Sequence, residues 1–292
     1  MSFQGFIIQL LSGLSVGMVI FLIAVGLSII FGTLGVLNLS HGSLYMLGAY
    51  LCFWLSSTLS QFSGSFWWAL FLAPVAVALF GGLMEVLLLR RIYEMEHLVQ
   101  FLLTFALILI IGDLCKLGWG VDYHMVETPW PLNGPFILGQ FIFPRYNIFL
   151  ILSGPAIFVG LWSLIRYTRL GRVIRAVTYS REMASALGVN VPMVYTGVFM
   201  LGCGLAGLGG ALVAPMSAVM PGMDMVVLVD CFIIVVIGGL GSLTGAFLGS
   251  IIFGLVHAFG ILVAPRLAIA FGFILMIVVL IIRPWGLMGK PE

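Results

Sequence analysis

Apolar residues along this chain form long continuous runs that short polar stretches separate. A helix that crosses the hydrocarbon core of a bilayer needs about 20 mostly apolar residues, and the runs have this length. They do not alternate with a period of two, so helices are favoured over strands. The pattern predicts nine membrane spans, in a range of eight to ten, at residues 6–31, 44–60, 66–89, 98–117, 147–165, 193–214, 226–240, 244–264 and 267–282. We therefore expect an all-α, polytopic transmembrane helical bundle that forms a single domain over residues 1–292.

The composition supports a membrane location. Of 292 residues, 62% are hydrophobic and 8% are charged, whereas about a quarter of the residues in a soluble domain carry charge. In lipid the backbone must satisfy its own hydrogen bonds, which leaves helices and closed barrels as spanning structures. The net charge is +2, and no basic stripe predicts nucleic-acid binding. The four cysteines are scattered and form no CxxC pair, so neither a disulfide framework nor a metal site is expected.

The basic residues fall mainly on one side of the nine-span arrangement. Nine of the twelve follow the third, fifth or last run, and the positive-inside rule places them in the cytoplasm. The C-terminus is then expected in the cytoplasm and the N-terminus outside. The nine residues are Arg90, Arg91, Arg166, Arg169, Arg172, Arg175, Arg181, Arg283 and Lys290.

Residues 166–191 form the longest charged stretch of the chain. Arginines recur every three positions from Arg169 to Arg175, while Val173 and Val177 face another way, as in an amphipathic helix. A second short helix is predicted to end at Gly188, just before a proline. We interpret this stretch as a docking surface for a cytoplasmic partner; the alternative is a basic loop that only fixes the topology.

Motifs in this stretch and elsewhere resemble a known family. The spacing E-x-A-x-x-x-G at Glu182, Ala184 and Gly188 is similar to the first part of the "EAA" loop of ABC importer permeases. Met183 replaces the middle alanine, and the later I-x-L-P part is not evident. The branched-chain amino acid permease family is matched more closely, through Arg172, Arg175, Met183, Ala184, Leu187, Gly188, Val189 and Asn190. Residues 26–32, 36–42, 45–50 and 238–246 also resemble that family, so the resemblance extends from end to end.

The resemblance implies a permease subunit of a type II ABC importer-like system, with interrupted helices, in the bacterial cytoplasmic (inner) membrane. Its partners would be a second, homologous permease in a heterodimer, two cytoplasmic ATPase subunits and an extracytoplasmic solute-binding protein. Residues 169–188 would include the helix that couples to the ATPase. In such a family the solute is a branched-chain or other amino acid, urea or a short amide, or an aromatic acid.

The same resemblance assigns ATPase coupling to a set of residues in this segment, namely Arg172, Arg175, Glu182, Met183, Ala184, Leu187 and Gly188. The chain has no G-x-x-x-x-G-K-[ST] phosphate loop. We therefore expect no enzyme activity and no cofactor in this chain, with ATP and Mg²⁺ bound by the partner subunits.

Polar residues within or beside the apolar runs are candidates for the translocation path. Broken helices and ionisable groups at membrane depth are tolerated where they line a cavity or are buried in protein. The alternatives are an ordinary inner loop for the stretch from Gly32 to Ser43, and hydrogen bonds between helices for the ionisable groups. The candidates are Asn38, Ser40, His41, Asp230 and His257.

Small residues recur every four positions in two runs, which suits close helix packing. The alternative is that one of these faces meets the partner permease. The residues are Gly202, Ala206, Gly210, Gly241, Gly245 and Gly249. Gly32-x-x-Gly35 and Gly238-x-x-Gly241 form a similar pair, as in transporters with internal repeats.

The remaining charged residues give weaker expectations. Glu85 lies about one turn from Arg90, and its side chain is expected to reach inward to the membrane surface. Asp113 and Lys116 are expected to pair near the outer end of their span. The outer loop, residues 118–145, either helps to dock a binding protein or is an ordinary structured loop.

An ion-coupled secondary transporter is the main alternative function. It would need carboxylates near the bilayer centre. Only Asp230 and Asp113 are available, and they form no cluster in the sequence. A channel and an intramembrane enzyme are less favoured, because no filter sequence, H-E-x-x-H motif or nucleophile elbow is present.

Overall fold

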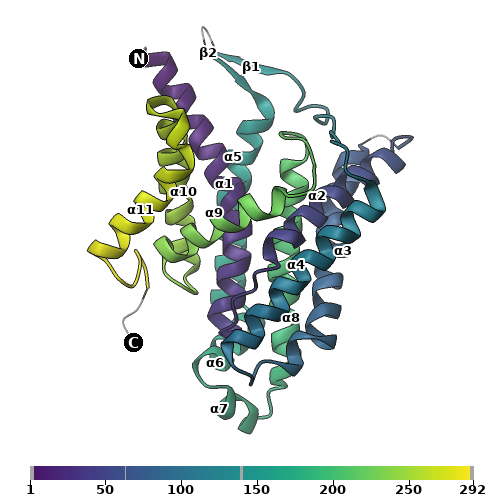
Figure 1. Cartoon of the computed structure of the whole chain (residues 1–292), viewed down its shortest axis with the longest axis vertical. Coiled ribbons are helices and arrows are strands. Elements are labelled where there is room, and N and C mark those ends of the chain that lie inside the picture. The colour runs from purple at the N-terminus through teal and green to yellow at the C-terminus, as the bar shows by residue number, and fades with distance from the viewer. Residues whose placement is uncertain (1–2, 63, 139–140, 290–292) are drawn as a thin grey trace.

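The computed structural model describes residues 3–62, 64–138 and 141–289, and it is mostly helical (Figure 1). Each of the nine predicted spans corresponds to one α-helix, so the predicted polytopic bundle is confirmed. The nine helices are α1 (Phe3–Leu34), α2 (His41–Thr58), α3 (Ser65–Leu87), α4 (His97–Trp119), α5 (Arg145–Tyr167), α8 (Val191–Val213), α9 (Met223–Gly238), α10 (Leu243–Val263) and α11 (Ala268–Ile282). Lys290 lies outside the described residues.

Seven helical segments in the described residues are long and apolar enough to cross a membrane. The two that do not qualify are α2 and α9. Helix α9 has 16 residues, so it rises about 24 Å, which is less than the roughly 30 Å of a hydrocarbon core. Helix α2 begins with polar residues that are buried in the protein. Both helices therefore depend on neighbouring helices to cover their ends.

Helix α1 runs through the middle of the molecule (Figure 1). Its residues from Gly17 to Ile30 are buried without a gap. Helices α2, α3 and α8 lie on one side of α1, and α10 and α11 lie on the other, while α9 crosses α1 between the two groups (Figure 1). The core of the protein is therefore built around α1 rather than at one face of the bundle.

A backbone break separates α1 from α2. Gly35 has φ +70°, a conformation that glycine adopts without steric cost. The Asn38 Oδ1 atom then accepts hydrogen bonds from the backbone N (3.1 Å) and the Oγ (2.6 Å) of Ser40, a turn that precedes the first residue of α2. Helix α2 starts at His41, three residues before the predicted span, so the connection between α1 and α2 is limited to residues 35–40.

A second break separates α9 from α10, and it meets the first. Gly239 and Gly241 have φ +98° and +78°. A Cβ atom added at Gly32 would lie 2.8 Å from the Cα of Gly241, and one added at Gly241 would lie 2.9 Å from the Cα of Gly32. The two glycine motifs that the sequence pairs by pattern therefore touch in space.

Glycines also bring α8 and α10 against their neighbours. A Cβ at Gly202 of α8 would lie 2.8 Å from the carbonyl oxygen of Gly26 in α1, and one at Gly210 would overlap the backbone of Tyr45 in α2. In α10, Gly245 and Gly249 approach the backbone of α9 at Gly238 in the same way, and Ala206 of α8 is fully buried. In lipid, where no hydrophobic force drives helices together, such close backbone approach provides the packing contacts.

The segments outside the bundle gather at its two ends. Strands β1 (Pro135–Leu138) and β2 (Phe141–Pro144) form an antiparallel ribbon, which the sequence did not predict. Helices α6 (Arg169–Tyr179) and α7 (Arg181–Ala186) lie at the opposite end (Figure 1). The short 3₁₀ helices η1 (Leu89–Arg91) and η2 (Pro265–Leu267) complete the described elements.

Two glycines of α8 give a matched test of this packing. We expect Gly202→Ala to destabilise the protein by about 1–3 kcal/mol, because the added methyl group overpacks a backbone contact. A Cβ at Gly197 meets nothing within 4 Å, so Gly197→Ala should instead stabilise by roughly 0.5–1 kcal/mol through helix propensity. Thermal unfolding in detergent measures both; equal midpoints for the two variants would contradict the packing argument.

Candidate functional site

The segment with the strongest functional signal is residues 169–188, called the coupling segment below. The Thr168 Oγ1 atom caps α6 by accepting from the N of Gly171 (3.1 Å), and the Ser180 Oγ caps α7 by accepting from the N of Met183 (3.2 Å). Gly188, with φ +83°, then follows the end of α7 at a position that favours glycine. The two predicted short helices are thus confirmed.

The surface of the coupling segment is both polar and apolar. Met183 and Leu187 are 67% and 81% exposed, and Tyr179 is 94% exposed, whereas Ala184 is buried. Arg172 and Glu182 are exposed. Large exposed apolar side chains in a segment outside the bundle are typical of a protein interaction site.

One arginine, Arg175, connects α6 to the end of α5. The Arg175 guanidinium donates to the carbonyl oxygen of Ile165, which α5 leaves unpaired near its C-terminus. The Arg166 guanidinium lies 5.1 Å from the ring centroid of Trp162, a cation–π contact within α5 itself. Of the two predicted coupling arginines, Arg175 therefore holds the segment to the bundle, whereas the Arg172 side chain is exposed and forms no hydrogen bond or ion pair with the described residues.

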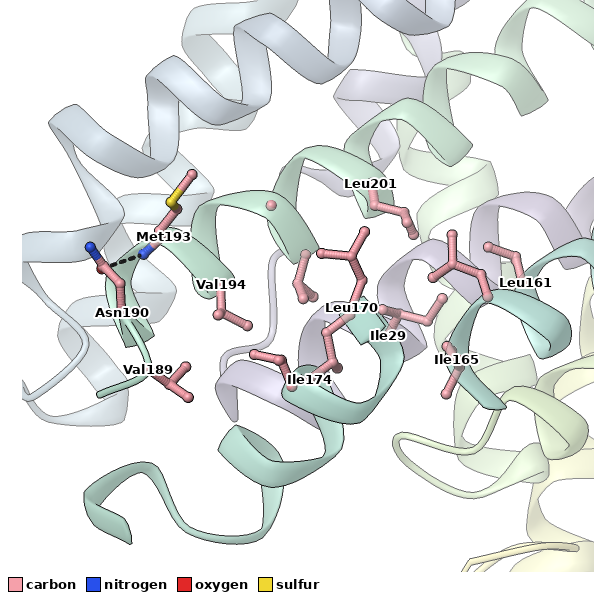
Figure 2. A pocket seen from close by; sticks show the side chains of 14 residues that line it. Ile29, Leu161, Ile165, Leu170, Ile174, Val189, Asn190, Met193, Val194 and Leu201 are labelled. Atoms are coloured by element: carbon pink, nitrogen blue, oxygen red, sulfur yellow. Dashed lines mark hydrogen bonds between the residues drawn. The ribbon is translucent and has the colours of Figure 1, made fainter. Parts of the chain in front are cut away.

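An apolar cavity of about 480 Å³ lies between α6 and α8, bordered also by α1 and α5. Leu170 and Ile174 of α6 point into it across from Val194 and Leu201 of α8, while Ile165 closes the side toward α5 (Figure 2). The helix α6 therefore does not pack tightly onto α8.

A buried carboxylate lies where α3 meets α8. Glu85 is fully buried and pairs with Arg90, with 3.2 Å between Oε2 and Nη2. Glu85 also accepts hydrogen bonds from the Thr196 hydroxyl (2.7 Å) and the Tyr93 hydroxyl (3.0 Å). The expectation that Glu85 extends toward the membrane surface is thus wrong, because three donors satisfy its charge inside the protein.

Tyr93 lies between α3 and α4, outside the spans. Burial, together with the nearby Glu85 carboxylate, raises the pKa of Tyr93 above its ordinary value. The phenol therefore stays protonated and keeps donating to Glu85 at neutral pH. The second predicted pair, Asp113 with Lys116, is confirmed at 3.0 Å on the exposed face of α4.

The candidate path residues lie in three separate places. Asn38, Ser40 and His41 are fully buried, and the His41 Nε2 atom lies 2.9 Å from the carbonyl oxygen of Ile23 in α1. Asp230 of α9 is partly exposed. His257 of α10 stacks on Phe253, with 6.0 Å between ring centroids.

The sequence reasoning missed a buried carboxylate at the start of α9. Asp224 is 5% exposed, and its Oδ2 atom accepts a hydrogen bond from the Ser43 hydroxyl at 2.8 Å. This bond joins the first turn of α2, which follows the break at Gly35, to the first turn of α9, which ends at the break at Gly239. The position of Asp224 just after Gly222, at the head of an apolar run, was the available signal.

The outer loop is packed against α2 by one histidine. His124 stacks on Phe53 with 4.3 Å between ring centroids, and its Nε2 atom lies 3.0 Å from the carbonyl oxygen of Trp119. Its backbone exchanges two hydrogen bonds with Val219, before α9. Trp130 is exposed. Within the described residues no group of three or more His, Cys, Asp or Glu side chains could hold a metal ion.

The fold is a multi-pass helical bundle with interrupted helices and a projecting helical segment. The chain belongs to the family described as the permease component of the branched-chain amino acid transport system, which matches residues 9–280. No solved structure matches the chain.

Curated relatives match over almost the whole chain. The high-affinity branched-chain amino acid transport system permease protein BraD of Pseudomonas aeruginosa is 30% identical, over 97% of this chain and 96% of BraD. LivH of Escherichia coli K12, which has the same description, is 27% identical over 99% of this chain and 97% of LivH. A probable branched-chain amino acid transport permease protein, LivH of Methanocaldococcus jannaschii, is 25% identical over 92% of this chain and 88% of that protein.

The bond between α2 and α9 gives a prediction. Ser43→Ala should destabilise the protein by about 1–3 kcal/mol, because it leaves the buried Asp224 carboxylate without this donor. Ser250→Ala is the matched control: its hydroxyl is also in a buried residue but donates only to Phe247 of its own helix. Thermal unfolding in detergent compares them, and an equal effect of both changes would show that the interhelical bond adds no stability.

Proposed function

We propose that this chain is the membrane-spanning permease subunit of a binding-protein-dependent ABC importer, and that the coupling segment docks on a cytoplasmic ATPase. The observation that carries the proposal is the exposed pair of helices, α6 and α7, at one end of a bundle whose family is a permease family. Met183, Leu187 and Tyr179 supply exposed apolar contacts there, and Arg172 and Glu182 supply charge.

The proposed assembly contains a second, homologous permease, two ATPase subunits that bind ATP and Mg²⁺, and an extracytoplasmic solute-binding protein. The proposed solute is a branched-chain amino acid or a related small solute. This proposal rests on the names of the relatives, which are permeases of branched-chain amino acid transport systems. The proposed location is the bacterial inner membrane, with α6, α7 and the C-terminus in the cytoplasm, supported by the basic residues of these segments.

The proposed path for the solute includes Asn38, Ser40, His41, Asp230 and His257. It is supported by two buried polar atoms, Nδ2 of Asn38 and Nδ1 of His41, that have no hydrogen-bond partner among the described residues. Buried unpaired polar atoms are costly and need an explanation. A conformation in which α1 and α2 separate from their neighbours would expose these atoms to water and solute.

Uptake in proteoliposomes tests the proposed function. The chain is reconstituted with its candidate permease, ATPase and binding-protein partners, and entry of labelled leucine is followed. Uptake should require ATP hydrolysis and should persist when ionophores collapse the sodium and proton gradients. Uptake that follows either gradient without nucleotide would favour an ion-coupled transporter and would overturn the proposal.

Two exposed methionines give a matched test of the docking surface. Met183→Ser should weaken ATPase binding about ten-fold, equivalent to ~1.4 kcal/mol, because it removes an apolar contact from the interface. Met125→Ser, in the outer loop, is the control, since Met125 is 76% exposed and lies at the other end of the molecule. Binding of the purified ATPase to nanodisc-embedded permease measures the affinity. An unchanged affinity for Met183→Ser would place the interface elsewhere.

A further inference from the structure

The two helices of the coupling segment are connected to α8 in different ways. On its α6 side, the apolar cavity separates Leu170 and Ile174 from the facing residues of α8 (Figure 2). On its α7 side, a short connection leads directly into α8. The backbone N of Val189 donates to the carbonyl oxygen of Ala184 (3.0 Å), and the Asn190 Oδ1 atom accepts from the N of Met193 (3.2 Å). Movement of α7 is therefore passed to the first turn of α8 more directly than movement of α6 is.

The first turns of α8 are in turn bonded to α3 by polar side chains. The Thr196 hydroxyl donates to Glu85 (2.7 Å), and the Arg90 Nη2 atom lies 2.5 Å from the Thr196 Oγ1 atom and 3.5 Å from the carbonyl oxygen of Pro192. The Tyr93 ring meets the Tyr195 ring edge-on, with 5.6 Å between centroids. One buried carboxylate, that of Glu85, is shared by all the hydrogen-bonding side chains of this junction.

A charged cleft of about 580 Å³ lies directly beside this junction. Arg90 and Glu94, from the turn between α3 and α4, face Arg181 and Glu182 of α7 across it. The turn and the coupling segment therefore flank the same opening, and Arg90 and Tyr93, which both bond to Glu85, also line it.

We propose that Glu85 is a positioning residue that links the coupling segment to α3, so that displacement of α7 and the start of α8 moves the inner end of α3. The proposal rests on the proposed function, because it needs an ATPase that displaces α7. A buried charge suits this task. Its three donors cannot part from it one at a time without leaving the carboxylate partly unpaired, which is expensive in a buried site. The junction therefore moves as a unit or not at all.

Glu85→Gln tests the link while keeping the size of the side chain. It removes the charge that holds Arg90 and leaves a side chain that matches the donors poorly. In the reconstituted assembly with its partner permease, ATPases and loaded binding protein, we expect ATP hydrolysis to continue. The number of leucine molecules imported per ATP hydrolysed should fall about five-fold or more, the scale of a typical coupling between sites.

The ratio of leucine imported to ATP hydrolysed separates a positioning role of Glu85 from a merely structural one. Loss of folded protein lowers import and hydrolysis together and leaves their ratio unchanged. Asp113→Asn is the control, since it removes a carboxylate from the exposed pair on α4, away from the junction, and should leave the ratio at the wild-type value. An unchanged ratio in folded Glu85→Gln overturns the inference.

Two milder variants decide the case if Glu85→Gln does not fold. Thr196→Val and Tyr93→Phe each remove one donor to Glu85, and each should lower the ratio; normal ratios in both overturn the inference. Failure of the proposed function looks different, because the wild-type assembly itself would then import leucine without hydrolysing ATP.

Discussion

The architecture depends on the absence of water inside a bilayer. Lipid offers no partners to backbone polar groups and no hydrophobic force that drives one helix onto another. The helices of this chain meet the first condition with their own backbone hydrogen bonds. Close backbone contact at glycines such as Gly202, Gly210 and Gly245 meets the second by providing packing contacts. Helix α1 lies at the centre of these contacts, which is why half of its residues are buried, whereas Gly272 is the only described residue of α11 that is buried. The outer helices are left to lipid or to other subunits.

The broken helices follow from the same constraint. A helix end inside the membrane leaves backbone amides and carbonyls unpaired, so it must be covered by protein. The start of α2 is covered by α1 and α9, through His41 with Ile23 and Ser43 with Asp224. The interruption at Gly35 thus puts polar side chains at depth in the bundle without exposing them to lipid. Three of these polar residues, Asn38, Ser40 and His41, belong to the solute path that we propose.

Much of the fold could be predicted because membrane spans have a strong local signal. All nine helices fell where apolar runs predicted them, and α6 and α7 followed from an amphipathic period with a glycine stop. The start of α2 was missed because the turn at Asn38 depends on side-chain bonds. The Glu85 and Asp224 contacts were missed for another reason: Thr196 and Ser43, their partners, lie 111 and 181 positions away in the chain. No local pattern records such pairs.

The contact between Gly32 and Gly241 has a consequence for how the sequence can change. Where a glycine faces a flexible side chain, as Gly82 faces Met200, a larger residue can be accommodated by a smaller neighbour. Gly32 and Gly241 face each other through Cα atoms, so neither has a side chain that could be replaced by a smaller one. A larger residue at one of the two positions therefore cannot be compensated by a smaller residue at the other. The sequence can change at these positions only if α1 moves away from the turn between α9 and α10.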